Sequence, residues 1–383
     1  MSDDVLEHAR RAWLPRLVAT GIPLRDYRET TERIDRWEDW CASWVTMGEV
    51  HEALADEAAG RISRAEHLRT AALSYHFGQF LFVHHPDEMQ ATHQRAVEVG
   101  RRAVEQMDPP GEHLTIPYGD ANLFGILRVP TSPSDPDDVV GSATAAVAGS
   151  AAAAVAVDGA ESSRRPLVIL ACGLDAAKEE LRAYETALLE RGMATLALEG
   201  PGQGEAQYAL AVDPAFETAV AAALDALDQD PRLDLDAVGM FGISMLGGLY
   251  TLRAAAHLDR IRACVTIASA YDFAEGWDTR AWLSREAFRI RARLDTLDEA
   301  HAYAREFTLA GVAEQVTCPV FLAHGTADRM CPPSALDRLA AAVSGEVTTR
   351  LVEGGAYVLH DLPYQYRPQS ADWLAARLGG TLS

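Results

Sequence analysis

The sequence predicts an α/β protein in which a mostly parallel, eight-stranded sheet follows an all-helical N-terminal region. Three observations predict this class. Residues 1–108 carry helical patterns and almost no strand pattern, whereas short apolar runs alternate with amphipathic segments from Pro166 onward. Apolar residues make up 48% of the 383 residues, which is enough to bury a large core. Because strands that alternate with helices form parallel sheets, we expect helices on both faces of this sheet.

The helical region is expected to span residues 1–108 and to form a cap domain. Trp37, Trp40 and Trp44 recur at three- and four-residue spacing, as on one face of a helix. Ser63-Arg-Ala-Glu66 has the pattern of a capping box, which predicts a helix from there to about Val83. Two interpretations stay open for the aromatic faces: a helix-on-helix core, which we favour, or an aromatic wall over a ligand pocket.

The second domain is expected to span residues 109–383. Residues 113–118 and 123–129 alternate around a Gly-Asp-Ala-Asn turn and predict a β-hairpin. Residues 131–164 are rich in Ala, Ser and Pro, so we expect a long, flexible surface loop. The further strands are expected at 167–171, 194–198, 237–241, 263–268, 320–323 and 347–352. The helices are expected at 178–191, 214–229, 247–257, 281–307, 335–343 and 370–378.

Composition excludes several classes of function. The net charge of −22 argues against binding to nucleic acids and to anionic membrane surfaces. Five scattered cysteines without a Cys-x-x-Cys pair indicate free thiols, and no cluster of side chains has the spacing of a metal site. The acidic start is followed by no apolar segment, and the Ala-rich run 143–157 is too short to span a bilayer. We therefore expect a cytoplasmic protein without a metal or cofactor, whose partner is a small-molecule substrate; a homodimer stays an open alternative.

The ends of three predicted strands carry candidate catalytic side chains. Ser244 stands in Gly-Ile-Ser-Met-Leu-Gly-Gly, and small residues around a serine permit the sharp strand-to-helix turn of a nucleophile elbow. Asp328 follows the next-to-last strand, and Tyr357 and His360 follow the last one. Because ligands of parallel sheets bind at the carboxyl ends of the strands, we expect these side chains to share one site.

On these motifs the chain resembles two-domain α/β-hydrolases with an N-terminal helical domain. This group is typified by 2,6-dihydroxypseudooxynicotine hydrolase and includes FrsA-like esterases and fungal hydrolases that shorten polyketide pigments. The resemblance covers nearly the whole chain except residues 131–164. The motifs that carry it are Trp40-Cys41 with Trp44, Tyr75-His76-Phe77, Asp108-Pro-Pro, Gly173-Leu174 with Lys178-Glu179-Glu180, Arg191-Gly-Met-Ala-Thr195, Gly200-Pro-Gly-Gln-Gly-Glu205 and Ala371-Asp-Trp-Leu374.

The resemblance implies a fold, a set of roles and a type of reaction. It places the nucleophile at Ser244 and its acid partner at Asp328. It implies an oxyanion hole made by the backbone N–H groups of Leu174 and Met245, which would stabilise charge on an attacked carbonyl. The implied activity is hydrolysis of acyl-type carbonyl compounds, including carbon–carbon bonds next to a ketone. The implied pocket lies between the helical domain and the strand ends.

The sequence departs from this group at two positions. Leu246 stands as one extra residue between Ser244 and the glycine pair, where it could displace the Ser244 hydroxyl or the Met245 N–H. Tyr357 occupies the position of the group's catalytic histidine, and His360 falls three residues later. A neutral tyrosine has a pKa of about 10, so it is a poor acceptor for a serine proton at pH 7.

Four interpretations of these departures stay open. His360 has taken over as the base; Tyr357 acts as an acid or hydrogen-bond donor in altered chemistry such as cyclisation, retro-Claisen cleavage, elimination or decarboxylation; the protein binds a ligand without catalysis; or the motifs are misaligned. The first and second have equal weight, and both make the protein an enzyme that acts on a hydrophobic, carbonyl-bearing metabolite, with a polyketide-like aromatic as the expected class.

Further candidates for substrate contact come from two segments. Tyr75, His76 and Phe80 lie on the predicted cap helix, although a role in the helical core is the simpler interpretation for them. Glu275 and Asp278 follow a strand end, and we favour a solvated or structural role for them over substrate polarisation. Lys178 is expected to pair with nearby carboxylates.

Overall fold

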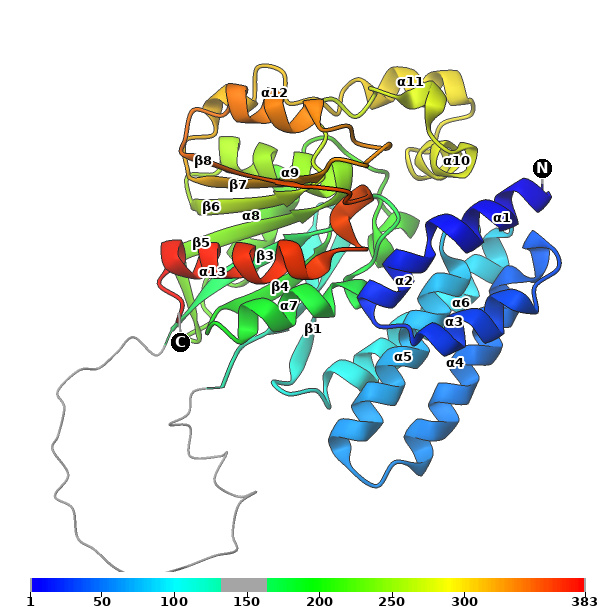
Figure 1. Ribbon diagram of the computed structural model, residues 1–383. Helices are drawn as coiled ribbons and strands as arrows, with labels where there is room; N and C mark the ends of the chain where they lie inside the picture. The colour runs from blue at the N-terminus through cyan, green and yellow to red at the C-terminus, as the bar shows by residue number, and fades with distance from the viewer. Residues whose placement is uncertain (1, 132–163, 382–383) are drawn as a thin grey trace, which may run out of the picture.

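The computed structural model describes residues 2–131 and 164–381 (Figure 1). Most of the loop expected at 131–164 therefore lies outside the described residues. The N-terminal helices gather on one side of the sheet (Figure 1). They are α1 (Ser2–Ala12), α2 (Leu14–Thr20), α3 (Leu24–Glu32), α4 (Trp40–Glu57), α5 (Arg61–Gln79) and α6 (Pro86–Val104).

Aromatic rings fill the space between the first helices. Trp40 and Trp44 are fully buried, and the Trp37 ring stacks on Trp40 with centroids 5.5 Å apart. Trp13 of the α1–α2 junction meets Trp40 edge-on at 5.4 Å. For these tryptophans the interpretation as a helix-on-helix core is confirmed.

The eight strands form one sheet in the order β1-β2-β4-β3-β5-β6-β7-β8. The hairpin of β1 and β2 is confirmed, and β2 also pairs antiparallel with β4, whereas every later pair is parallel. The strands are β1 (Gly111–Tyr118), β2 (Ala121–Arg128), β3 (Arg165–Ala171), β4 (Ala194–Glu199), β5 (Leu233–Ile243), β6 (Ile261–Ile267), β7 (Val320–Gly325) and β8 (Val347–Val352). The predicted fold class is therefore confirmed.

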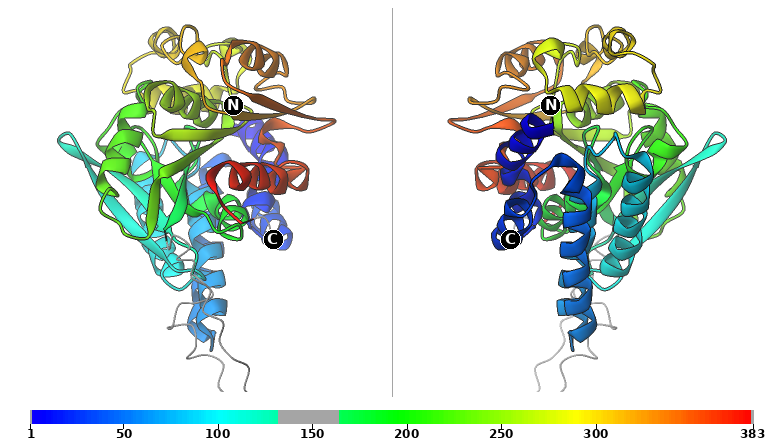
Figure 2. Two further views of the ribbon diagram at one scale, coloured as in Figure 1. Left: turned by 90° about the vertical axis from the view of Figure 1, so that its left-hand side faces the viewer. Right: turned by 90° about the vertical axis from the view of Figure 1, so that its right-hand side faces the viewer.

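Helices cover both faces of this sheet (Figure 2). Helices α7 and α13 pack together on one face, and α8 packs with α9 on the other. The helices are α7 (Arg182–Leu189), α8 (Glu217–Ala226), α9 (Ser244–His257), α10 (Trp282–Arg291), α11 (Leu297–Ala304), α12 (Ser334–Ala342) and α13 (Arg367–Leu378).

Two predicted helix features are wrong. The helix expected at 281–307 is broken between α10 and α11, where Arg293 has a φ of 58° and Thr296 opens a new helix with a capping box to Glu299. The capping box expected at Ser63 is absent because α5 begins earlier, after Gly60, which places Ser63 inside its first turn.

Residues 2–131 and 164–381 contain neither a candidate membrane-spanning helix nor a candidate metal-binding cluster. No helix in these segments is long and apolar enough to cross a membrane. Within the same segments, no group of three or more His, Cys, Asp or Glu side chains could hold a metal ion.

Candidate active site

Ser244 stands on a tight turn between strand β5 and helix α9. β5 ends at Ile243, α9 begins at Ser244, and the Ser244 backbone has a φ of 79°, a left-handed conformation that is strained for a residue with a side chain. The turn can close because Gly242 has no side chain: a Cβ at this position would stand only 2.4 Å from the Gly247 carbonyl oxygen. This is the geometry of a nucleophile elbow. Leu246 lies buried within the first turn of α9.

Tyr357 is the side chain that meets Ser244. Its phenol oxygen lies 2.7 Å from Ser244 Oγ and accepts a hydrogen bond from the Met245 N–H at 3.3 Å. Burial raises the pKa of the phenol above its ordinary value of 10, so Tyr357 keeps its proton at neutral pH. With its oxygen accepting from Met245, the phenol can direct this proton to Ser244 Oγ.

The two residues that follow Tyr357 have a strained backbone conformation. Tyr357–Leu359 form a short 3-10 segment, η7, in which Val358 and Leu359 have φ values of 59° and 56°. A β-branched residue such as valine is rarely found there, because its side chain collides with the backbone. Strain of this kind persists only where the surroundings enforce it, and it is common at functional sites.

His360 is not hydrogen-bonded to Ser244. Its Nδ1 is buried without a hydrogen-bond partner among the described residues. Burial lowers the pKa of His360 to about 3, and the nearby Arg16 guanidinium acts in the same direction. The imidazole is therefore neutral at pH 7, and its low pKa would make it a weak base.

Asp328 follows β7 and has one satisfied and one unsatisfied oxygen. Its Oδ1 accepts the N–H groups of Met330 at 2.8 Å and Cys331 at 2.9 Å, whereas its Oδ2 is buried without a partner in the described part of the chain. Burial raises the pKa of Asp328 to about 6. In a serine hydrolase the free carboxylate oxygen would accept the imidazole N–H of the catalytic histidine, a group that tyrosine lacks.

The loop after β3 comes up against Ser244 from the other side. A Cβ on Gly173 would stand 2.5 Å from Ser244 Oγ, so only glycine allows this approach. Leu174 follows, and its carbonyl oxygen accepts a hydrogen bond from the Arg291 guanidinium. The structure thus brings Ser244, Tyr357, Met245 and the Leu174 loop together.

Charged side chains of the helical region contact the segment that follows β3. Arg16 of α2 forms a two-bond pair with the Glu180 carboxylate, at 2.8 and 2.7 Å, and lies 3.5 Å from Asp175. His76 Nε2 of α5 lies 2.6 Å from the same Glu180. Sequence reasoning missed Arg16, because its partner lies 164 residues away and no local pattern connects them.

The other predicted contact residues lie at varying places around the site. Phe80 is buried, with the Arg16 guanidinium 4.4 Å above its ring, and His76 is held by Glu180. Tyr75 points away into the helix pack, where its hydroxyl donates to Glu52. A role in substrate binding stays a prediction for these three.

Glu275 and Asp278 lie at the surface. Glu275 is half exposed and pairs with Arg338, and Asp278 is exposed. Between β6 and α10, the same segment carries Arg280, which is buried and contacts Met245 Sδ at 3.9 Å. Sequence reasoning considered the acidic residues of this segment and missed the arginine.

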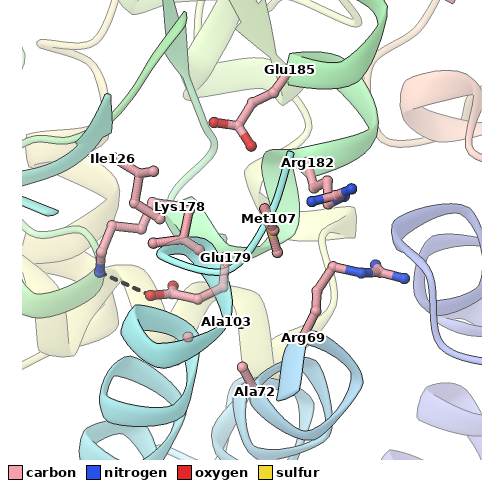
Figure 3. Close-up of a pocket in the computed structure, with 11 residues that line it drawn as sticks. Arg69, Ala72, Ala103, Met107, Ile126, Lys178, Glu179, Arg182 and Glu185 are labelled. Atoms are coloured by element: carbon pink, nitrogen blue, oxygen red, sulfur yellow. Dashed lines mark ion pairs between the residues drawn. The ribbon is translucent and has the colours of Figure 1, made fainter. Parts of the chain in front are cut away.

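Lys178 pairs with carboxylates, as expected. Its buried Nζ lies 2.8 Å from Glu205, 3.0 Å from Glu179 and 3.2 Å from Glu199. Figure 3 shows the Lys178–Glu179 pair beside a cavity of about 20 Å³, which has room for one water molecule. Arg182 and Glu185 also border this cavity, but no candidate catalytic side chain does.

Comparisons with known proteins agree with this fold. Residues 180–353 match the model of the prolyl oligopeptidase family. The chain is 29% identical to 2,6-dihydropseudooxynicotine hydrolase of Paenarthrobacter nicotinovorans, over 94% of this chain and 90% of that relative. It is 31% identical to the hydrolase acrC of Aspergillus aculeatus, over 65% of this chain but only 59% of that relative.

Two solved structures share the whole architecture. The crystal structure of 2,6-dihydroxy-pseudo-oxynicotine hydrolase superposes with a TM-score of 0.81 at 27% identity and covers 95% of both chains. The structure of AbyA5 superposes with a TM-score of 0.75 at 20% identity, over 98% of this chain and 95% of that one, which shows a common fold. The resemblance expected from the sequence motifs is confirmed.

Proposed function

We propose that this chain, which has the fold of the α/β-hydrolases and named hydrolases among its relatives, is an enzyme that cleaves a bond beside a carbonyl group in a hydrophobic small molecule. The observation that carries the proposal is the 2.7 Å contact between the Tyr357 hydroxyl and Ser244 Oγ. In a serine hydrolase a histidine stands beside the serine and takes its proton. Here the neighbour of the serine is a phenol that holds its own proton.

The chemistry of a protonated phenol suits cleavage of a carbon–carbon bond next to a ketone. When water adds to one carbonyl of a 1,3-diketone and the bond breaks, the electron pair passes to an enolate, which must be protonated. A phenol beside the substrate can donate a hydrogen bond to the carbonyl oxygen and then a proton to the enolate, and the phenolate regains a proton from the hydrated carbonyl as that group becomes the carboxylic acid. Ester hydrolysis through an acyl-serine would need a base instead. The substrate we propose is a polyketide-like aromatic 1,3-dicarbonyl.

The same donor would also serve a repurposed reaction such as cyclisation, elimination or decarboxylation, because each of these develops charge on a carbonyl oxygen. The proposed role of Tyr357 is common to all of them. The panel of products formed from a 1,3-diketone distinguishes these reactions from hydrolysis, since only hydrolysis yields an acid and a ketone.

One observation favours a second candidate, a protein that binds a ligand without catalysis. The Met245 N–H, which an oxyanion would need, already donates to Tyr357 Oη at 3.3 Å. If no substrate displaces the phenol from this N–H, the oxyanion hole stays filled. Turnover therefore separates the two candidates.

The proposed function is tested with 1-phenylbutane-1,3-dione as the first probe and product analysis by chromatography. We expect the wild-type protein to release a carboxylic acid and a ketone. Tyr357→Phe should lower kcat by about 100-fold or more, because it removes the proton donor but keeps the ring. Tyr118→Phe in the β1–β2 hairpin is the control and should match the wild type. Full turnover by Tyr357→Phe would contradict the role of the phenol, and binding without any turnover across aryl 1,3-diketones would favour the second candidate.

A further inference from the structure

Two buried arginines beside the oxyanion loop and the elbow lack a carboxylate partner. Arg280 is 8% exposed and Arg291 is 6% exposed, and neither forms an ion pair with an acidic side chain in the described part of the chain. A buried guanidinium without a counter-charge is costly, because burial removes the water that would solvate it. Such a charge calls for a compensating anion.

Arg280 holds its guanidinium in place through neutral groups alone. One nitrogen, Nη2, donates to the carbonyl oxygens of Phe273 at 2.7 Å and Glu275 at 3.3 Å, and it lies 3.9 Å from Met245 Sδ. The guanidinium carbon lies 4.2 Å from the centroid of the Phe273 ring. The second nitrogen, Nη1, is buried and has no partner among the described residues. Donors of this group thus remain unused next to the residue that follows Ser244.

Arg291 is in a similar state on the other side of the site. Its Nη1 donates to the carbonyl oxygens of Leu174 and Gly202, and its Nε is buried without a partner in the described chain. Leu174 and Met245 are the two residues expected to form the oxyanion hole. Each of them is therefore contacted by a guanidinium that forms no direct ion pair with a described carboxylate.

The chain could have paired Arg280, because acidic residues stand close to it in sequence. Glu275 directs its carboxylate away to the exposed Arg338, and Asp278 is exposed. Arg16 shows the alternative arrangement at the same site, since its guanidinium is fully engaged by Glu180 and borders Asp175. Arg280 thus forms no ion pair with a described carboxylate, although the chain has a net charge of −22.

We propose that the substrate is an organic anion, a 1,3-dicarbonyl that carries a carboxylate or has ionised to its enolate, and that Arg280 binds its charged oxygen. This inference rests on the proposed function, because it names the class of carbonyl compound that the site takes. Arg280 is then a specificity-determining residue, which selects the charged form before Tyr357 acts on the carbonyl. Arg291 supports the same selection by adding positive charge behind the Leu174 loop.

The test measures binding of 4-phenyl-2,4-dioxobutanoate and of its neutral carboxamide by calorimetry. The two probes have nearly the same shape and differ in charge. We expect the wild type to bind the carboxylate at least about 10-fold more tightly than the carboxamide, as for a charge-assisted hydrogen bond. Arg280→Met should abolish this preference and leave the affinity for the carboxamide within about 2-fold. The control Arg338→Met removes an exposed arginine near the same segment and should keep the preference.

Equal affinity of the wild type for both probes overturns the proposal, whatever the variants do. A preference that persists in Arg280→Met overturns the assignment to Arg280. If Arg280→Met fails to fold, Arg280→Lys keeps the charge but lacks the guanidinium, and it should retain a reduced preference for the carboxylate. An unchanged preference would contradict the assigned hydrogen bond from Arg280 Nη1. Binding of 1-phenylbutane-1,3-dione, measured between pH 6 and 10, tests whether the charged oxygen is that of an enolate. In the wild type the affinity should rise with pH as this diketone ionises to its enolate, and in Arg280→Met it should not.

The two proposals fail in different ways. Selective binding of the carboxylate through Arg280, with no turnover of any 1,3-dicarbonyl, would refute the proposed function and leave this inference intact. Turnover that requires Tyr357, with equal binding of the charged and neutral probes, would do the reverse.

Discussion

Asp328 has a buried carboxylate oxygen that Tyr357 does not engage. Its Oδ2 is buried without a partner in the described chain, and burial raises its pKa from 3.8 to about 6. Between pH 4 and 6 the folded protein therefore holds this proton more firmly than the unfolded chain does. The free energy of unfolding that Asp328 contributes consequently falls as the pH rises through this window, by about 3 kcal/mol.

Asp328→Asn tests this electrostatic cost. Asparagine keeps an acceptor for the Met330 and Cys331 N–H groups and carries no charge. As the pH rises from 4 to 7.5, we expect the variant to gain about 3 kcal/mol of stability relative to the wild type, measured by urea denaturation. The exposed Asp259→Asn is the control and should show no such gain. If the difference in stability between the variant and the wild type stays constant across this pH range, burial does not destabilise the ionised form of Asp328.

Ser244 is half-buried, and its neighbour is a protonated phenol, which cannot take the proton of the serine hydroxyl. We expect a fluorophosphonate probe to label the wild type only weakly, since such probes need a serine whose proton is taken by a base. The labelled position is found by mass spectrometry, and Ser244→Ala should remove the label. Labelling as fast as that of an ordinary serine hydrolase would contradict this view of the site, and labelling that persists in Ser244→Ala would place the nucleophile elsewhere.

At the scale of elements, an ion pair between Arg16 of α2 and Glu180 connects the helical region to the segment after β3, which also carries Gly173 and Leu174. Arg16→Met breaks a pair whose side chains are 17% and 5% exposed. Loss of one partner from a buried pair leaves the other charge uncompensated, so we expect a loss of about 3 kcal/mol of stability and a lower kcat. Arg25→Met removes an exposed pair with Glu29 and should change stability by less than about 0.5 kcal/mol. Equal losses of stability in the two variants, measured by denaturation, would show that the Arg16–Glu180 pair does not stabilise the contact between the helical region and the segment after β3.

Elements with a strong local pattern could be predicted from the sequence, whereas contacts between distant elements could not. The strands were predictable because continuous apolar runs bounded by turns are typical of buried strands. The break between α10 and α11 was missed, although Thr296 and Glu299 have capping-box spacing, because the apolar pattern continues across it. The approach of Tyr357 to Ser244 spans 113 residues and depends on a strained loop, so no local pattern determines which of Tyr357 and His360 faces the serine.

At the scale of the whole molecule, contacts join the helical region to the segments that follow β3 and β4. His76 meets Glu180, and His93 Nδ1 lies 3.0 Å from the hydroxyl of Tyr208. Because separate units would leave Glu180 uncompensated, we expect the chain to unfold in one cooperative transition by calorimetry. Two resolved transitions would show that the helical region folds independently of the segment after β3.

The substitution Tyr357→His tests the central claim most directly, namely that Tyr357 stands where a hydrolase places its base. A histidine there could accept the Ser244 proton and donate to the free Oδ2 of Asp328. We predict that Tyr357→His gains esterase activity on p-nitrophenyl acetate, with kcat/KM rising through a pH of about 6.5. If instead Tyr357→His stays as inactive as the wild type, or if the wild type already hydrolyses the ester and His360→Ala abolishes that activity, the claim is contradicted.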